Sequence, residues 1–106
     1  MKIDFDIDRY VKRVRDGKNY FHTFINKESL AAGVLVLKPG EEDTQEPHEN
    51  DEVYYVLTGN GFLRINNNDH VVSPKLMYYV RKDTPHHFHS NSEELVVLYF
   101  FGGPDN

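Results

Sequence analysis

The sequence predicts an all-β domain in which about eight short antiparallel strands form a double-sheet jelly roll or small barrel, preceded by one short helix. After Gly17, short runs rich in Val, Tyr, Phe, Leu and Ile alternate with clusters of Gly, Pro, Asn and Asp. Helical periodicity is confined to the segment before that glycine. With 106 residues the chain is long enough for one hydrophobic core, so we expect one domain over residues 1–106.

Residues 6–16, which read DIDRYVKRVRD, predict a short amphipathic helix. An aspartate at position 6 or 8 is available as the N-cap, and Gly17 stands where a C-terminal stop belongs. The apolar residues recur at helical spacing; they are Ile7, Tyr10, Val11 and Val14.

The remaining chain predicts a barrel core over residues 20–101. Glycine, proline and asparagine clusters separate its apolar runs. The expected strands are 20–25, 30–38, 46–57, 61–65, 69–72, 77–81, 86–90 and 95–101. The runs 57–63 and 65–71 flank turn clusters and predict two consecutive hairpins. The tail 102–106, GGPDN, is expected to be loosely held.

Composition narrows the classes of function. A formal charge of −5 and scattered basic residues argue against nucleic acid or an anionic membrane as partner. The one basic patch, within residues 12–18, is interpreted as a solvated helix face. There is no cysteine, so a metal site must use histidine, carboxylates and water. Neither a secretory signal nor an apolar segment of about 20 residues is present, which predicts a soluble cytoplasmic protein.

The most informative feature is a set of four candidate metal ligands. Glu46, His48 and Glu52 occupy even positions in QEPHENDEVYYVLTG, so in a strand all three side chains would face one side. His86, in DTPHHFHS, could close the set from a second strand. Four residues of straight strand span about 13 Å, so the chain must bend between His48 and Glu52, at Pro47 or, by preference, at 49–51.

Two spaced motifs in the chain resemble those of the cupins. The first cupin motif runs Gly, five residues, His-x-His, three or four residues, Glu, six residues, Gly. Here Gly40, His48, Glu52 and Gly59 fall on it, with Glu46 in place of the first histidine.

The second cupin motif resembles the stretch 74–91, in which His86 takes the place of the metal-binding histidine. This stretch departs from the motif at Lys75 and Asp83, which replace glycines, and at Arg81, which replaces a proline. The resemblance spans about residues 30–101 and implies a double-stranded β-helix, the jelly-roll barrel of cupins.

The donor set predicts a divalent transition metal. Two imidazoles and one carboxylate suit Fe(II), and adding Glu46 shifts the preference toward Mn(II), Fe(II) or Zn(II), with Ni and Cu left open. In a strand, Tyr54 would face the same side as Glu52, and Phe88 the same side as His86, since each pair is two residues apart. Both are expected either to line a pocket or to pack in the core.

Two functions remain open at this point. The first is a mononuclear metal-dependent enzyme, dioxygenase-like, that acts on a small organic molecule inside the barrel. The second is a non-catalytic, metal-stabilised module that binds or senses a small ligand. We also expect a homodimer, because the Tyr-rich strands and the final run LVVLYFF offer more apolar surface than one small sandwich covers.

Overall fold

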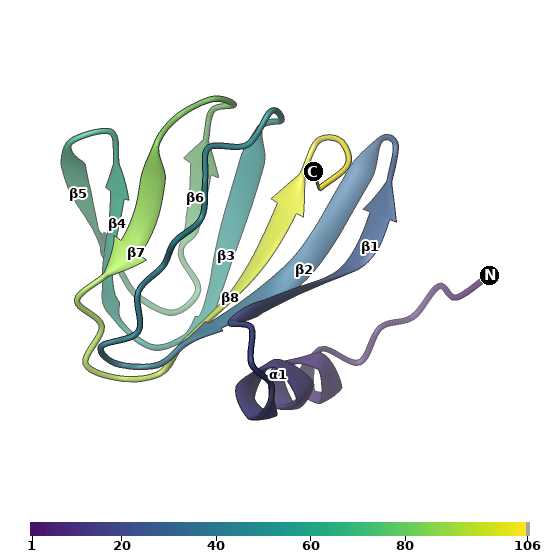
Figure 1. Ribbon diagram of the computed structural model, residues 1–106, viewed down its shortest axis with the longest axis horizontal. Coiled ribbons are helices and arrows are strands. Elements are labelled where there is room, and N and C mark those ends of the chain that lie inside the picture. The colour runs from purple at the N-terminus through teal and green to yellow at the C-terminus, as the bar shows by residue number, and fades with distance from the viewer. Residues whose placement is uncertain (106) are drawn as a thin grey trace.

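The computed structural model describes residues 1–105 and shows two facing β-sheets with one helix outside the larger sheet (Figure 1). Among these residues, eight strands form a five-stranded sheet of order β1-β2-β8-β3-β6 and a three-stranded sheet of order β5-β4-β7. All strand pairs are antiparallel. The elements are α1 (Ile7–Asp16), β1 (Phe21–Lys27), β2 (Leu30–Leu37), β3 (Glu52–Thr58), β4 (Gly61–Ile65), β5 (Asn68–Val72), β6 (Met77–Val80), β7 (His86–His89) and β8 (Leu95–Phe101). The predicted jelly roll is confirmed.

The helix α1 packs on the outer face of the five-stranded sheet. Asp6 caps it by accepting a hydrogen bond from the backbone N of Arg9 at 3.3 Å. Val11 and Val14 are buried against apolar residues of β2 and β8. This contact explains why β2 is buried on both faces, while its inner face joins the core between the two sheets. The predicted helix is therefore confirmed to within one residue.

The predicted strand 46–57 is wrong in its first half, because β3 begins only at Glu52. The preceding segment is irregular and bonds to a turn instead of a neighbouring strand. The carbonyl of His48 accepts from the backbone N of Asp83 at 2.7 Å, and the Asp51 carboxylate accepts from that of Lys82 at 2.9 Å. Pro47 has no backbone N–H to donate to a neighbouring strand. Because residues 46–51 form no strand, their successive side chains do not alternate between two faces.

Only the second of the two predicted hairpins is confirmed. β4 pairs with β5 and β7, whereas β3 pairs with β6 and β8 in the other sheet. The chain therefore crosses from one sheet to the other between β3 and β4. Gly59 and Gly61 permit this crossing, since their φ values of 106° and 124° lie in a region that other residues rarely adopt.

Residues 102–105 after β8 are hydrogen-bonded rather than loosely held, contrary to the prediction for the tail 102–106, whose last residue lies outside the described part of the chain. Figure 1 shows the chain folding back at the end of β8. The Pro104 carbonyl accepts from Asn50 at 3.0 Å, and the backbone N of Asp105 donates to Asn26 at 2.9 Å. The Asp105 carboxylate also accepts from the Thr23 hydroxyl. Three side chains thus hold residues 104–105 against the barrel.

No helix among residues 1–105 combines the length and the apolar character needed to cross a bilayer. The cytoplasmic location stays a prediction.

Candidate metal centre

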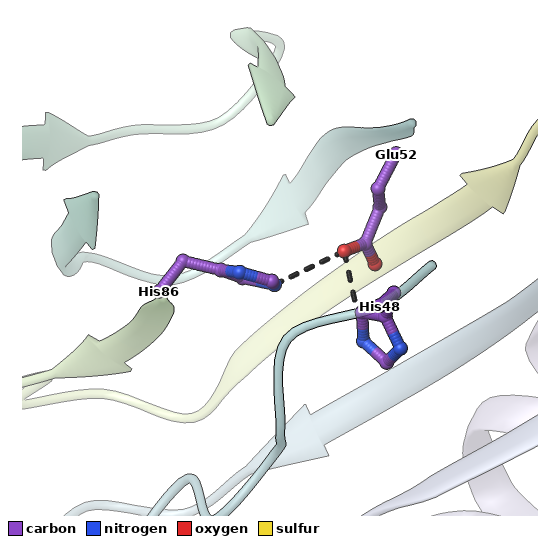
Figure 2. A group of neighbouring side chains, drawn as sticks. All are labelled: His48, Glu52 and His86. Atoms are coloured by element: carbon purple, nitrogen blue, oxygen red, sulfur yellow. Dashed lines mark ion pairs between the residues drawn. The ribbon is translucent and has the colours of Figure 1, made fainter. Parts of the chain in front are cut away.

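The two sheets bring together the side chains of His48, Glu52 and His86 (Figure 2). They come from three places in the fold: the segment before β3, the first residue of β3 and the first residue of β7. Glu52 Oε1 lies 3.1 Å from His86 Nε2 and 3.8 Å from His48 Nε2. The side chains of Glu52 and His86 are each only 2% exposed, and that of His48 is 19% exposed.

A backbone carbonyl orients the His86 ring. Its Nδ1 lies 2.7 Å from the oxygen of Thr84, a pure acceptor, so Nδ1 carries the proton and donates it. The free lone pair of a neutral His86 is therefore on Nε2, the atom that faces Glu52. A histidine ligand held by a second hydrogen bond in this way is a common feature of metal sites.

Glu52 carries an unsatisfied buried oxygen. Its Oε1 accepts no hydrogen bond of good geometry from residues 1–105, despite the short distance to His86. A buried carboxylate oxygen without a donor is costly, and a bound cation removes that cost. Donor atoms held at about 2.1 Å from one ion lie about 3 to 4 Å apart, which matches the observed separations. These residues fit a divalent metal.

Charge and burial act on the pKa values around this group. Burial lowers the pKa of His86, but contact with the Glu52 carboxylate and the bond to the Thr84 carbonyl outweigh it, so the pKa is raised. Burial, together with the charges of Glu52 and Asp43, raises the pKa of Tyr54 well above its ordinary value. The Tyr54 phenol is therefore neutral at physiological pH.

The predicted fourth ligand, Glu46, does not join the group. Its side chain is exposed, because residues 46–51 are irregular and the strand alternation that was to direct it inward is absent. Gln45 is turned inward instead. Its Oε1 accepts from the Tyr54 hydroxyl at 2.8 Å and lies 3.3 Å from His48 Nε2.

A buried aspartate holds Gln45 in this orientation. Asp43 is 7% exposed and accepts from the Gln45 side-chain amide at 2.7 Å, which directs the Gln45 oxygen toward Tyr54. The same carboxylate accepts from the Tyr20 hydroxyl at 2.9 Å and from the backbone N of Phe88 at 2.8 Å. Sequence reasoning missed Asp43 and Gln45, because both lie in the charged run EEDTQE, whose pattern is that of a solvated loop.

A cavity of about 460 Å³ adjoins the group, and His48 and Glu52 both line it. Tyr54 and Phe88, the expected pocket walls, are not among its lining residues. They are 0% and 1% exposed and pack edge to face in the core with ring centroids 4.9 Å apart. Ordinary core packing, the alternative left open for both, describes them. Tyr54 still reaches the group through its hydroxyl, 3.1 Å from His86 Nε2.

Known proteins resemble this chain in sequence and in fold. The family model for the cupin domain matches residues 33–102. The uncharacterized protein SCO3923 of Streptomyces coelicolor is 32% identical over 83 residues, which make up 78% of this chain and 79% of that protein.

Among solved structures, an uncharacterized conserved protein with a double-stranded β-helix domain from Klebsiella pneumoniae matches with a TM-score of 0.82 at 14% identity, over 99% of this chain and 93% of its own. The DMSP lyase DddQ of Ruegeria pomeroyi matches with a TM-score of 0.72 at 19% identity, over 78% of this chain and 46% of its own. At these identities the structural matches show the fold alone. The two segments that resemble the cupin motifs, the jelly roll and the matched family model together establish that this chain belongs to the cupin family.

Proposed function

We propose that this cupin holds one divalent transition metal, Fe, Mn or Zn, and uses it in a dioxygenase-type reaction on a small organic molecule in the adjoining cavity. The observation that carries the proposal is the group of His48, Glu52 and His86, whose buried, unsatisfied carboxylate oxygen lies beside a cavity of about 460 Å³. When bound, such a metal supplies Lewis-acid activation and, if it is iron, reactivity toward dioxygen.

We assign the fourth protein donor to Gln45 in place of Glu46. A closed ring of five atoms contains the four assigned ligand atoms and the neutral Tyr54 hydroxyl. In this ring Gln45 Oε1 is followed by the Tyr54 hydroxyl, His86 Nε2, Glu52 Oε1 and His48 Nε2. The successive separations are 2.8, 3.1, 3.1 and 3.8 Å, and 3.3 Å closes the ring. An amide oxygen adds a hard donor without adding charge, which leaves the site less negative than a second carboxylate would.

One observation favours the alternative, a non-catalytic binding or sensing module. The phenols of Tyr20 and Tyr99 line the cavity and are the natural candidates for proton transfer. Burial raises the pKa of Tyr20 to about 12, and burial also raises that of Tyr99. Both phenols therefore keep their protons at neutral pH and do not serve as general bases.

Turnover separates the two functions. The protein is loaded anaerobically with Fe(II) and then exposed to oxygen with candidate thiols, catechols and diketones. We expect oxygen uptake coupled to product in the parent and in His87→Ala, and none in His86→Ala. His87 is the matched control, since it is the next residue of β7 and lies outside the group of His48, Glu52 and His86, called the metal group below. Failure of every candidate in metal-loaded parent protein would support the binding module.

Metal content tests the site itself at lower cost. Parent and His48→Ala are purified side by side, and their metal is measured before and after titration with Fe(II), Mn(II) and Zn(II). Equal stoichiometric metal in both proteins would show that the proposed site is wrong. If the parent binds none of the three ions, the motif is vestigial.

We also propose that two copies pair through the outer face of the five-stranded sheet. The helix α1 covers the part of this face formed by β1, β2 and the start of β8. Over β3 and β6 the face remains apolar, and Met77 and Tyr79 are 63% and 62% exposed. We expect sedimentation to show a dimer at micromolar concentration and Tyr79→Lys to weaken it. A parent protein that sediments only as monomer contradicts this proposal.

A further inference from the structure

The cavity beside the metal group is lined by three carboxylates. Glu46, Glu52 and Asp105 reach it from three separate segments, and no lysine or arginine is among its lining residues within 1–105. Asp43 is not among the lining residues but accepts hydrogen bonds from two of them, Tyr20 and Gln45. In the part of the chain that the structure describes, neither Glu46 nor Asp105 takes part in an ion pair.

The metal does not cancel this charge. A divalent ion balances Glu52 and leaves one positive charge, which Glu46 and Asp105 together exceed. Asp43 adds a further negative charge close by, buried and held by neutral donors. The cavity therefore remains negative when the proposed site is filled, which disfavours anionic ligands and attracts cationic ones.

Aromatic rings form much of the remaining wall. Tyr20 and Phe21 pack edge to face with centroids 5.3 Å apart, and Tyr99 and Phe101 lie 5.6 Å apart. Ring faces attract cations, and aromatic walls combined with carboxylates are the usual means of binding alkylated ammonium groups.

One hydrogen-bonded link places a carboxylate beside these rings. The Tyr99 hydroxyl lies 2.7 Å from the Thr23 hydroxyl, which in turn bonds to the Asp105 carboxylate. Tyr99 reaches Thr23 because Gly33 lies beneath its ring; a Cβ at that position would collide with the phenol. Asp105 is thus held at the aromatic wall by the neutral Thr23 hydroxyl, which the Tyr99 hydroxyl contacts in turn, and not by a basic side chain.

From these contacts we propose that the cavity binds a small organic cation with an alkylated ammonium group. The ammonium group lies between Asp105 and the rings of Tyr99 and Phe101, and an oxygen of the same molecule reaches the metal group at His48 and Glu52. The inference rests on the proposed function, since it names the class of ligand for that site.

Calorimetric titration of the Mn(II)-loaded protein with two matched probes tests it. Choline carries the ammonium group, and 3,3-dimethylbutan-1-ol is its neutral isostere of the same shape. We expect choline to bind about 10-fold more tightly than the alcohol. Asp105→Asn keeps the side-chain shape and should remove most of this preference without changing the affinity for the alcohol. Glu49→Gln is the control, because it deletes one exposed negative charge in the segment before β3, outside the cavity lining.

Each outcome decides the inference. Equal or tighter binding of the alcohol, or an Asp105→Asn variant with unchanged choline preference, would overturn it. Binding of neither probe by protein that holds stoichiometric metal would overturn it too and leave the metal proposal intact. If the protein takes up no metal, the proposed function fails. The same comparison on metal-free protein then decides the cation inference, since Asp105 and the rings lie outside the metal group.

Discussion

Strand β7 carries a histidine–carboxylate pair on each of its faces, and the two pairs differ in what surrounds them. On the inner face His86 Nε2 lies 3.1 Å from Glu52, and on the outer face His89 Nε2 lies 2.9 Å from Asp69. The inner side chains are each 2% exposed, whereas the outer ones are 25% and 35% exposed. Residue type and distance alone do not separate a metal site from a surface ion pair.

The difference lies in how the carboxylate oxygens are satisfied. Asp69 accepts two hydrogen bonds from the Arg64 guanidinium, at 2.8 and 3.0 Å, as well as the contact from His89. Hydrogen bonding to Arg64 and His89 lowers the pKa of Asp69. Glu52 instead has a buried oxygen without a donor and a second histidine, His48, within reach. The inner pair fits a cation because the Glu52 carboxylate is buried and one of its oxygens has no hydrogen-bond donor.

The largest test of this contrast is truncation of each histidine. We expect His86→Ala to weaken metal binding by more than about 100-fold, since loss of a ligand exceeds the effect usually seen for its supporting residues. His89→Ala should leave the affinity within about 2-fold. Calorimetric titration with Mn(II) or Zn(II) measures both. Similar losses in the two variants would place the metal elsewhere.

A smaller effect is expected one step away from the inner pair. Gln45→Ala should weaken metal binding by about 10-fold, because it removes the oxygen assigned to the fourth position, and Glu46→Ala by less than about 2-fold. We expect the absorption spectrum of the Co(II)-loaded protein to change in Gln45→Ala and to stay the same in Glu46→Ala, because it depends on the ligands and their geometry. If Glu46→Ala changes that spectrum and Gln45→Ala does not, the fourth donor has been misassigned.

Neutralising the carboxylates should have opposite effects on the stability of the metal-free protein. Above the raised pKa of His86, where that ring is neutral, Glu52→Gln removes a buried charge with an unpaired oxygen. At such a pH we expect the free energy of unfolding to rise by about 1 kcal/mol while metal binding is lost. Asp69→Asn breaks a satisfied ion pair and should lower that free energy slightly. Urea denaturation in the presence of a chelator measures both. A destabilised Glu52→Gln protein would show that the inner pair already satisfies itself.

The smallest effect concerns pH. Because the pKa of His86 is raised in the folded metal-free protein, its protonated form stabilises the fold. That stability is fully present below the unfolded pKa of about 6.5 and is lost as pH rises through the raised folded value. We expect the free energy of unfolding of the parent, relative to His86→Ala, to fall over this range. Denaturation curves across it with no such fall would contradict the raised pKa.

Local patterns in the sequence were sufficient wherever the chain is regular. The run of apolar residues at 95–101 and the turn-bounded run at 61–65 correspond to β8 and β4 with unchanged bounds. Alternation within 86–89 correctly separates the buried His86 from the half-buried His87 and His89, because that segment is a strand.

The alternation of side chains between two faces did not predict the direction of Glu46, because the segment before β3 is irregular. In such a segment the direction of a side chain follows from its partners, and these are distant in sequence. Asp43 is held by the backbone of Phe88, and His48 by that of Asp83. Nothing within EEDTQE distinguishes the buried Asp43 and the inward Gln45 from their exposed neighbours.

Composition, periodicity and turn residues by themselves predicted a jelly roll or small barrel with one helix, because these properties depend on neighbours within a few residues. The alternation of faces and the cupin-like motif spacing added His48 and His86 as the histidines that could serve a metal. The tertiary structure alone decided that Gln45, and not Glu46, is turned toward Tyr54 and His48 and that Asp105 lies at an aromatic wall. Both arrangements depend on contacts between segments far apart in the chain, and local sequence patterns carry no record of those contacts.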